Sequence, residues 1–191
     1  MNGEEMILGI DKIIETIKTQ KLVEGLVEEN LNFEGCGLDL RAGEILEMGE
    51  DEGYLHVETR KTPNYKLLGR FEEGKVTKVK LQSRKNYVVK TIETINVPEN
   101  LFGIFFPRNT LVKSGLMAHP GRVDPGYKGS FTFNLFNTSN NGFEIEMGAR
   151  IGNMIFIRVE GKTNLYKGQW QGGRTFIENE EKQVKQGARV N

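Results

Sequence analysis

The sequence predicts a mainly β fold, a barrel or jelly roll, with an N-terminal helix and a C-terminal arm. Helical spacing of apolar residues occurs only near the N-terminus, at Ile13, Ile14 and Ile17. Beyond that segment, short apolar runs alternate with turn residues, and the chain holds 23 glycines. From about residue 161 the chain becomes polar and glycine-rich and finishes in a charged segment. These three observations separate a helix, a body of strands and an arm.

The elements follow from this pattern in order. Asp11 can cap the helix, and Gly25 is expected to stop it. Strands are expected at 38–42, 75–82, 86–97, 101–106, 129–137, 143–146 and 153–159. Residues 129–146 form a predicted hairpin, because alternating apolar residues precede a polar Asn/Ser/Gly turn. Residues 49–74, which contain Pro63 and several glycines, are expected to be an insertion or a long loop.

The length of 191 residues suits one domain that buries its own core. Residues 1–160 are assigned to the β domain and 161–191 to the arm, whose composition is typical of a segment that is mobile without ligand. The N-terminal apolar stretches are short and are interrupted by Asp11, Lys12 and Glu15. Neither a signal peptide nor a membrane span is therefore expected, and a cytoplasmic location follows as the default.

The composition excludes several classes of function. Lysine plus arginine total 26, as do aspartate plus glutamate, so the formal net charge is zero and the pI is about 6.8. This balance argues against a protein that coats nucleic acid or an acidic membrane, because a basic surplus supplies the affinity there. One cysteine excludes an internal disulfide, and two histidines leave few ligands for zinc. The H-x-E and P-C-x-x-C signature of zinc-dependent deaminases cannot be formed.

The segment FPRNTLVKSGL, residues 106–116, is a candidate phosphate-binding site. It breaks an apolar run at Pro107 and Arg108 and then presents Asn109, Thr110 and Lys113. Two cations and several donors at the end of a strand suit a phosphate group. A solvated turn with a short helix and ordinary surface charges is the alternative that the spacing alone favours.

Two aspartates are candidates for catalysis or metal binding. Asp124, in HPGRVDPGYKG, precedes a Pro-Gly turn and Tyr127. A well-placed carboxylate can orient a water as general base, worth roughly 10²–10⁴ in rate. Asp39, in GLDLRAGE, could belong to a magnesium shell. For each, the alternative is a turn in which the side chain satisfies local backbone N–H groups.

Four segments occur in a fixed order: CGLDLRA, PRNTLVKSGL, PGRVDPGYKG and GARIGNMIF. This series resembles the family that unites dCTP deaminases with the trimeric dUTPases. The openings MILGIDKIIETIKTQKLV and ENLNFEGCGLDLRAGE, and the segment INVPENLFGIFFPRNTLVKSGL, are similar to the deaminase branch. The tail YKGQWQGGRT is similar to the closing arm of that branch. The resemblance covers most of residues 6–175, apart from 49–74.

The resemblance implies a dUTPase-like distorted β-barrel of jelly-roll type, in a homotrimer with sites between subunits. The substrate would be a pyrimidine deoxynucleoside triphosphate carrying Mg²⁺. Arg108 would contact the phosphates, Asp124 would orient the water, Tyr127 would pack on the deoxyribose and exclude a ribose 2′-hydroxyl, and Asp39 would support the metal through water. The remaining residues that the resemblance brings to the substrate are Asn109, Thr110, Lys113, Arg122, Trp170 and Gln171, the last two in a segment that would fold over the nucleotide. Arg150 opens the strand of the fourth motif.

Three positions depart from the deaminase pattern. The glutamate expected ten residues after Asp124 is Asn134, an amide with no usable pKa for proton transfer. The serine expected after Arg108 is Asn109, and the second arginine is Lys113. Hydrolysis of a triphosphate needs none of the missing groups. We therefore expect a dUTP diphosphatase with Asp124 as base and Asn134 available to bond the uracil edge or, structurally, the backbone; a zinc-independent dCTP deaminase and an inactive nucleotide-binding regulator are the alternatives.

Overall fold

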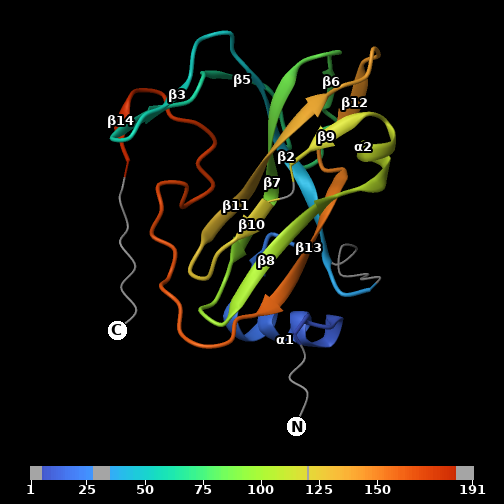
Figure 1. Ribbon diagram of the computed structural model, residues 1–191. Helices are drawn as coiled ribbons and strands as arrows, with labels where there is room; N and C mark the ends of the chain where they lie inside the picture. Colours follow the sequence, from blue (N-terminus) through green and yellow to red (C-terminus); the bar gives the residue numbers. More distant parts are fainter. Residues whose placement is uncertain (1–5, 28–34, 120, 184–191) are drawn as a thin grey trace.

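A single antiparallel sheet curls into a half-barrel that carries most of the chain (Figure 1). The computed structural model describes residues 6–27, 35–119 and 121–183. Its helices are α1 (Ile10–Gln20) and α2 (Asn109–Lys113). Its strands are β1 (Val23–Glu24), β2 (Leu38–Met48), β3 (Tyr54–Leu55), β4 (Thr59–Lys61), β5 (Tyr65–Arg70), β6 (Lys78–Leu81), β7 (Asn86–Asn96), β8 (Leu101–Pro107), β9 (Leu116–Ala118), β10 (Gly121–Val123), β11 (Lys128–Asn137), β12 (Phe143–Glu146), β13 (Arg150–Arg158) and β14 (Glu181–Lys182). The predicted mainly β fold is confirmed.

The strand order explains the curvature. The main sheet runs β10-β8-β13-β2-β7-β11-β9, with β1 on β7 and β5 on β2. Strands β9 and β10 are consecutive in the chain but stand at opposite ends of this order. In a flat sheet they would lie roughly 29 Å apart, at about 4.8 Å per strand. The two residues between them reach only about 10 Å. The sheet must therefore close on itself, which brings the loops around β9, β10 and β11 together.

Aromatic rings fill the interior of the curled sheet. Phe105 of β8 lies 4.8 Å from Phe131 and 4.7 Å from Phe133 of β11, measured between ring centroids. All three side chains are buried. Phe131 and Phe133 alternate with Thr132 and Asn134, which point outward along the same strand. The period of two seen in the sequence thus divides β11 into a core face and an outer face.

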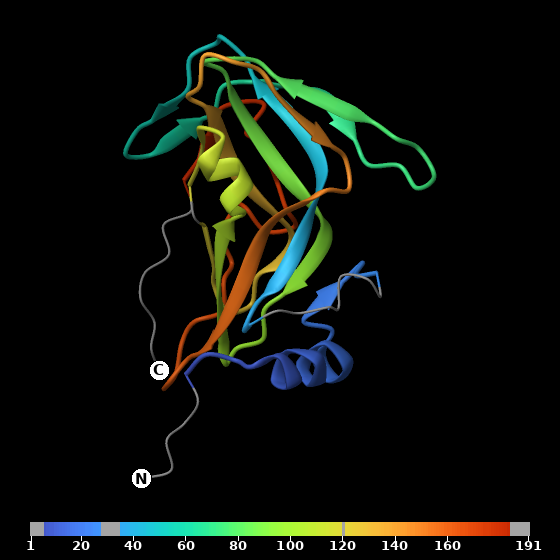
Figure 2. The same cartoon turned by 90° about the vertical axis from the view of Figure 1, so that its right-hand side faces the viewer.

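Helix α1 covers one end of the half-barrel, as Figure 2 shows, and Ile13 is its fully buried residue. Its limits differ from those expected. Gly9 occupies the N-cap, so Asp11 lies in the first turn, where a negative charge favours the helix dipole. The helix ends at Gln20, because Lys21 adopts a left-handed conformation at φ 53°. Asp11 as cap and Gly25 as stop were therefore wrong.

The segment 49–74 is not a loop, contrary to expectation. It forms the hairpin of β3 and β4, and then β5, which pairs with β2 along the edge of the main sheet. Its alternation is weak because few of its side chains are buried, and Pro63 and the glycines mark its turns. The strand expected at 75–82 is shortened to Lys78–Leu81. The hairpin expected over 129–146 was wrong, because β11 pairs with β7 and β9 whereas β12 pairs with β6. None of the described helices is long and apolar enough to cross a membrane.

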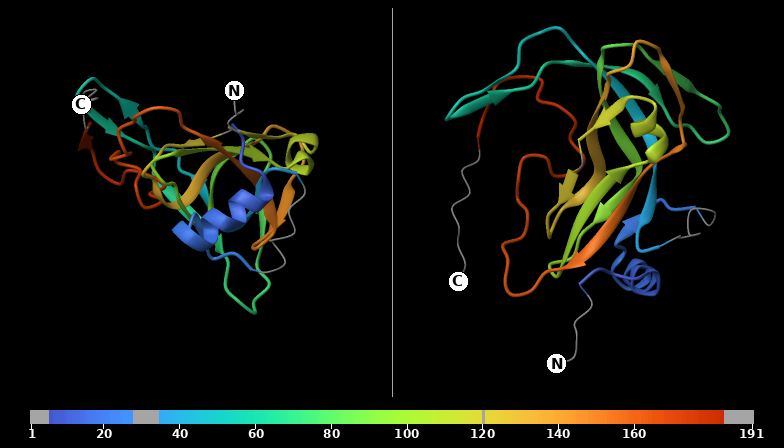
Figure 3. Two further views of the ribbon diagram at one scale, coloured as in Figure 1. Left: turned by 90° about the horizontal axis from the view of Figure 1, so that it is seen from below. Right: turned by 45° about the vertical axis from the view of Figure 1, so that its right-hand side comes forward.

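The predicted arm lies along the outside of β10 and β11 and continues to the β3–β4 hairpin (Figure 3). Ile177 of the arm is 1% exposed, so this segment contributes to the packed body. Residues 184–191 of the arm lie outside the described residues. The division at residue 160, and the mobility of the arm without ligand, stay predictions.

Candidate active site

Asp124 lies on a turn that the main chain closes by itself. The Tyr127 amide donates to the Asp124 carbonyl at 3.1 Å, and the Gly126 amide donates to the Val97 carbonyl at 2.8 Å. The Asp124 carboxylate takes no part in these bonds; in the described residues its ion-pair partner is Arg122, with 3.6 Å between Nε and Oδ1. Because the turn does not use this carboxylate, the group is free to serve a ligand.

A cavity of about 300 Å³ opens beside this turn. It is lined by Arg122, Val123, Asp124, Tyr127, Phe131, Thr132, Tyr166 and Trp170. Asp124 is the one carboxylate among these lining residues, and four of the others are aromatic. Such a cavity suits the part of a ligand that contains a ring and is largely apolar, and it places that part beside a single carboxylate.

Tyr127 forms the floor of the turn. Its side chain is buried, at 9% exposure, and its hydroxyl donates to the Ser130 carbonyl at 2.7 Å. Burial, with a smaller contribution from Tyr166, raises the pKa of Tyr127 to about 12. The ring of Tyr166 lies 5.8 Å away. Tyr127 is therefore neutral at physiological pH and is one of the residues that line the cavity.

A second polar cluster surrounds Asp39 on β2. Its Oδ2 accepts from Arg108 Nη1 at 3.0 Å and from Arg150 Nη1 at 3.2 Å, and its Oδ1 accepts from Asn153 Nδ2 at 3.3 Å. The two guanidinium groups remain about half exposed. One carboxylate thus orients two arginines side by side, with a net positive charge. Such a pair suits an anion with several oxygens, since each guanidinium can bind two of them.

Helix α2 follows Arg108 directly. Its buried residue is Leu111, at 5% exposure, which anchors the helix. Asn109, Thr110 and Lys113 are exposed on its surface. The expected alternative, a turn with a short helix, is what forms, and it leaves these three polar side chains free to meet a ligand.

The residues around Asp39 do not form a site for a resident metal. Two guanidinium groups and an amide already occupy the carboxylate oxygens, and they repel a further cation. In the part of the chain that the structure describes, no group of three or more His, Cys, Asp or Glu side chains is placed to bind a metal ion. A role for Asp39 in magnesium binding through water stays a prediction.

The Asp39 cluster and the Asp124 cavity lie at opposite ends of β8. Gly103 pairs with Val123, next to Asp124, whereas Arg108 follows the far end of the strand. Arg108 is five residue steps from Gly103, or roughly 17 Å at 3.3 Å per residue. The two clusters are therefore separated from each other within one chain.

Asn134 lies on the outer face of β11, exposed, two residues beyond Thr132 of the cavity. Its carbonyl accepts from the His119 amide at 3.3 Å, which continues the register of β9 against β11. His119 therefore lies beside Asn134 through this main-chain contact. The sequence reasoning missed it, and the pairing of two separate strands is needed to find it.

The arm docks on the Asp124 turn through its backbone and one side-chain amide. Gln171 donates from Nε2 to the Gly126 carbonyl at 3.0 Å, and its Oε1 accepts from the Lys128 amide at 2.9 Å. The Tyr166 amide donates to the Pro125 carbonyl at 2.7 Å. Gln171 thus holds the turn in this structure, while its predicted contact with substrate stays a prediction.

Comparison with known proteins gives a consistent result. A family model described as dCTP deaminase-like matches residues 7–159. The chain is similar to the dCTP deaminase of Thermococcus kodakarensis, with 33% identity over 83% of this chain and 90% of that protein. It is also similar to the deoxyuridine 5′-triphosphate nucleotidohydrolase of Methanocaldococcus jannaschii, with 32% identity over 84% of this chain and 99% of that protein. The solved structure of 2′-deoxycytidine 5′-triphosphate deaminase from Agrobacterium tumefaciens shares the fold, with a TM-score of 0.62 and 13% identity over 83% of this chain and 48% of that one.

Proposed function

Because the chain belongs to the dCTP deaminase-like family, we propose that it hydrolyses dUTP to dUMP and pyrophosphate, with Asp124 as the general base. One observation carries the proposal: Asp124 is the one carboxylate among the lining residues of the aromatic cavity, on a turn that does not use it. Hydrolysis needs a single base near the substrate. Deamination needs a second group that delivers a proton to the departing ammonia.

In this reaction the Asp124 carboxylate accepts a proton from water as the water oxygen bonds to phosphorus. The phosphoanhydride bond between the α- and β-phosphates breaks, and pyrophosphate leaves with the bridging oxygen. Tyr127 packs against the deoxyribose, and its buried ring excludes a 2′-hydroxyl. Asn134 offers both a donor and an acceptor to the uracil edge.

The phosphate chain binds at Arg108 and Arg150, which Asp39 holds in a fixed orientation. Asn109, Thr110 and Lys113 of α2 add donors, and Arg122 adds a cation beside Asp124. Mg²⁺ enters as part of the substrate, bound to the phosphate oxygens, because the described residues supply no metal-binding cluster of their own. It neutralises charge on the triphosphate.

A complete site needs two copies of the chain, and we place three copies in a homotrimer. The distance between Arg108 and Asp124 within one chain supports this arrangement. Exposed apolar side chains lie on or near α2 as well: Phe106 at 47%, Val112 at 53% and Met117 at 55%. A surface of this kind is suited to contact with another subunit.

Deamination of dCTP is the second candidate. The dCTP deaminase of T. kodakarensis is 33% identical to this chain, and His119 lies opposite Asn134 on the neighbouring strand. An imidazole, unlike an amide, can act as a general acid, which makes His119 the candidate proton donor in this reaction.

The test of the base assignment is Asp124→Asn. This change keeps the size of the side chain and removes its basicity. Pyrophosphate release from dUTP should fall by roughly 10²–10⁴, while binding of a non-hydrolysable dUTP analogue is retained. Retained turnover would refute the role of Asp124. Lys66→Gln on β5, an exposed residue away from the cavity, serves as the control and should keep full activity.

A further inference from the structure

The far end of the arm is bound to the β3–β4 hairpin. Strand β14 pairs with β4, with Glu181 opposite Arg60 and Lys182 opposite Thr59. The amide of Ile177 donates to the hydroxyl of Thr62 at 2.8 Å. The β3–β4 hairpin, which lies in the segment expected to be an insertion or a long loop, thus holds the arm through several independent contacts.

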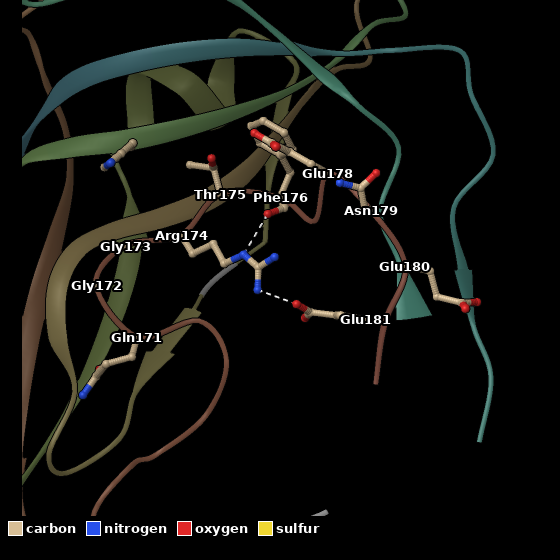
Figure 4. Close-up of a pocket in the computed structure, with 11 residues that line it drawn as sticks. Gln171, Gly172, Gly173, Arg174, Thr175, Phe176, Glu178, Asn179, Glu180 and Glu181 are labelled. Atoms are coloured by element: carbon tan, nitrogen blue, oxygen red, sulfur yellow. Dashed lines mark hydrogen bonds and ion pairs between the residues drawn. The ribbon is translucent and has the colours of Figure 1, made fainter. Parts of the chain in front are cut away.

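Arg60 and Glu181 form the centre of this contact. Arg60 donates to Glu181 Oε1 from Nε at 3.0 Å and from Nη2 at 2.8 Å. Arg174 Nη1 donates to Glu181 Oε2 at 2.7 Å (Figure 4). The Arg60 and Glu181 side chains are only 15% and 21% exposed. Burial acts to raise the pKa of Glu181, but the hydrogen bonds from Arg174 and Arg60 outweigh it, and the pKa lies below its ordinary value. The Glu181 carboxylate is therefore ionised at neutral pH while it is bonded to Arg60 and Arg174.

Arg60 also reaches the candidate active site. Its guanidinium carbon lies 4.9 Å from the ring centroid of Trp170, a cation–π contact. Trp170 lines the 300 Å³ cavity together with Asp124 and Tyr127. One arginine therefore joins the hairpin, the end of the arm and the wall of the cavity.

The arm residues between the Asp124 turn and the β3–β4 hairpin line a second cavity. This cavity, of about 600 Å³, is lined by Lys90, the arm residues from Gln171 to Phe176, and those from Glu178 to Glu181 (Figure 4). A cavity of this size supplies few packing contacts to the arm residues that line it. Trp170 itself is held by its amide, which donates to the Tyr166 hydroxyl at 3.2 Å, and by the Arg60 contact on its ring.

We propose that the β3–β4 hairpin is a latch and that Arg60 is a positioning residue, which holds the arm and Trp170 over the nucleoside cavity before substrate arrives. Pre-ordering removes part of the entropy cost of binding. The kinetic consequence rests on the proposed nucleotide hydrolysis, whereas the latch itself does not.

Trp170 is the sole tryptophan of the 191-residue chain, so its fluorescence reports the arm directly. In Arg60→Ala, the acrylamide quenching constant of the ligand-free protein should rise about twofold, because a half-buried ring becomes exposed. The quenching constant of Arg60→Lys should lie between those of wild type and Arg60→Ala, since lysine keeps the charge but loses the planar guanidinium. Arg70→Ala is the matched control: Arg70 lies on the neighbouring β5, pairs with Glu44 and should leave quenching unchanged.

Kinetics give the second readout. The KM for dUTP should rise about 2- to 12-fold in Arg60→Ala, the equivalent of re-ordering one side chain on binding, with kcat within about twofold. Glu181→Gln should reproduce both effects and serves in place of Arg60→Ala should that variant not fold. Quenching and KM equal to those of Arg70→Ala would overturn the latch. If quenching differs between wild type and Arg60→Ala but the wild type releases no pyrophosphate from dUTP, the proposed function is refuted and the latch still stands.

Discussion

Arg108 and Asp124 should be able to come from different copies of the chain in one working site. Arg108→Ala removes a phosphate contact, and Asp124→Asn removes the base, so each variant alone should be nearly inactive. Gly103, which pairs with the residue before Asp124, lies roughly 17 Å along β8 from Arg108 of the same chain. If each site takes Asp124 from one subunit and Arg108 from the next, co-expression of the two variants should rebuild some sites.

The expected recovery follows from random assembly. Half of the subunits supply an intact Asp124 and half supply an intact Arg108, so about one quarter of all sites are complete, and in a mixed trimer selected by both tags about one site in three. The assay is pyrophosphate release from dUTP by co-purified variants that carry different tags, relative to wild type, with light scattering to give the oligomeric state. Activity no higher than the sum of the separately purified variants would refute a site shared between subunits.

Three further outcomes follow from the structure. Burial raises the pKa of Tyr127 to about 12 from an ordinary 10.0. The stability that its buried neutral form contributes is therefore complete below pH 10 and is lost as the pH rises toward 12. An ultraviolet titration of wild type against Tyr127→Phe should place the midpoint of this tyrosine near pH 12, and a midpoint near pH 10 would contradict the assignment. The hydrogen bonds from Arg174 and Arg60 hold the pKa of Glu181 below its ordinary 4.5. The contact of Glu181 with these arginines is therefore fully formed above pH 4.5 and is lost as the pH falls through the pKa of Glu181 in the folded protein. Acrylamide quenching of Trp170 should rise in acid in wild type and should not change with acid in Glu181→Gln. Asn134→Glu should change dUTP turnover by less than about tenfold, measured by pyrophosphate release, and a larger loss would show that the amide is essential for hydrolysis.

Much of the fold was accessible from the sequence because it depends on local pattern. The alternation in β11 predicted its core face, since Phe131 and Phe133 could be buried together only as a strand. The limits of α1 were not accessible in the same way. Asp11 is a good cap by type, but the helix begins one residue earlier, with Gly9 as its N-cap. Strand β5 escaped detection because it pairs at an edge and buries few side chains.

The site shows the same division. Asp124 and Tyr127 could be placed together from the sequence because their turn is continuous in the chain. The pairing of Arg108 with Arg150 through Asp39 depends on three strands brought together by the sheet order. The contact of Arg60 with Trp170 joins segments that share no pattern in the sequence. Contacts between distant segments become visible only when the chain is folded.

The central claim is that a lone Asp124 in the nucleoside cavity performs hydrolysis and not deamination. The most direct measurement incubates the protein and Mg²⁺ with dUTP and with dCTP separately, and assays pyrophosphate, ammonia and the nucleotide product of each. The account predicts dUMP and pyrophosphate from dUTP, and no ammonia from dCTP. Ammonia and dUTP formed from dCTP would contradict it, and would direct attention to His119 beside Asn134 as the source of the proton.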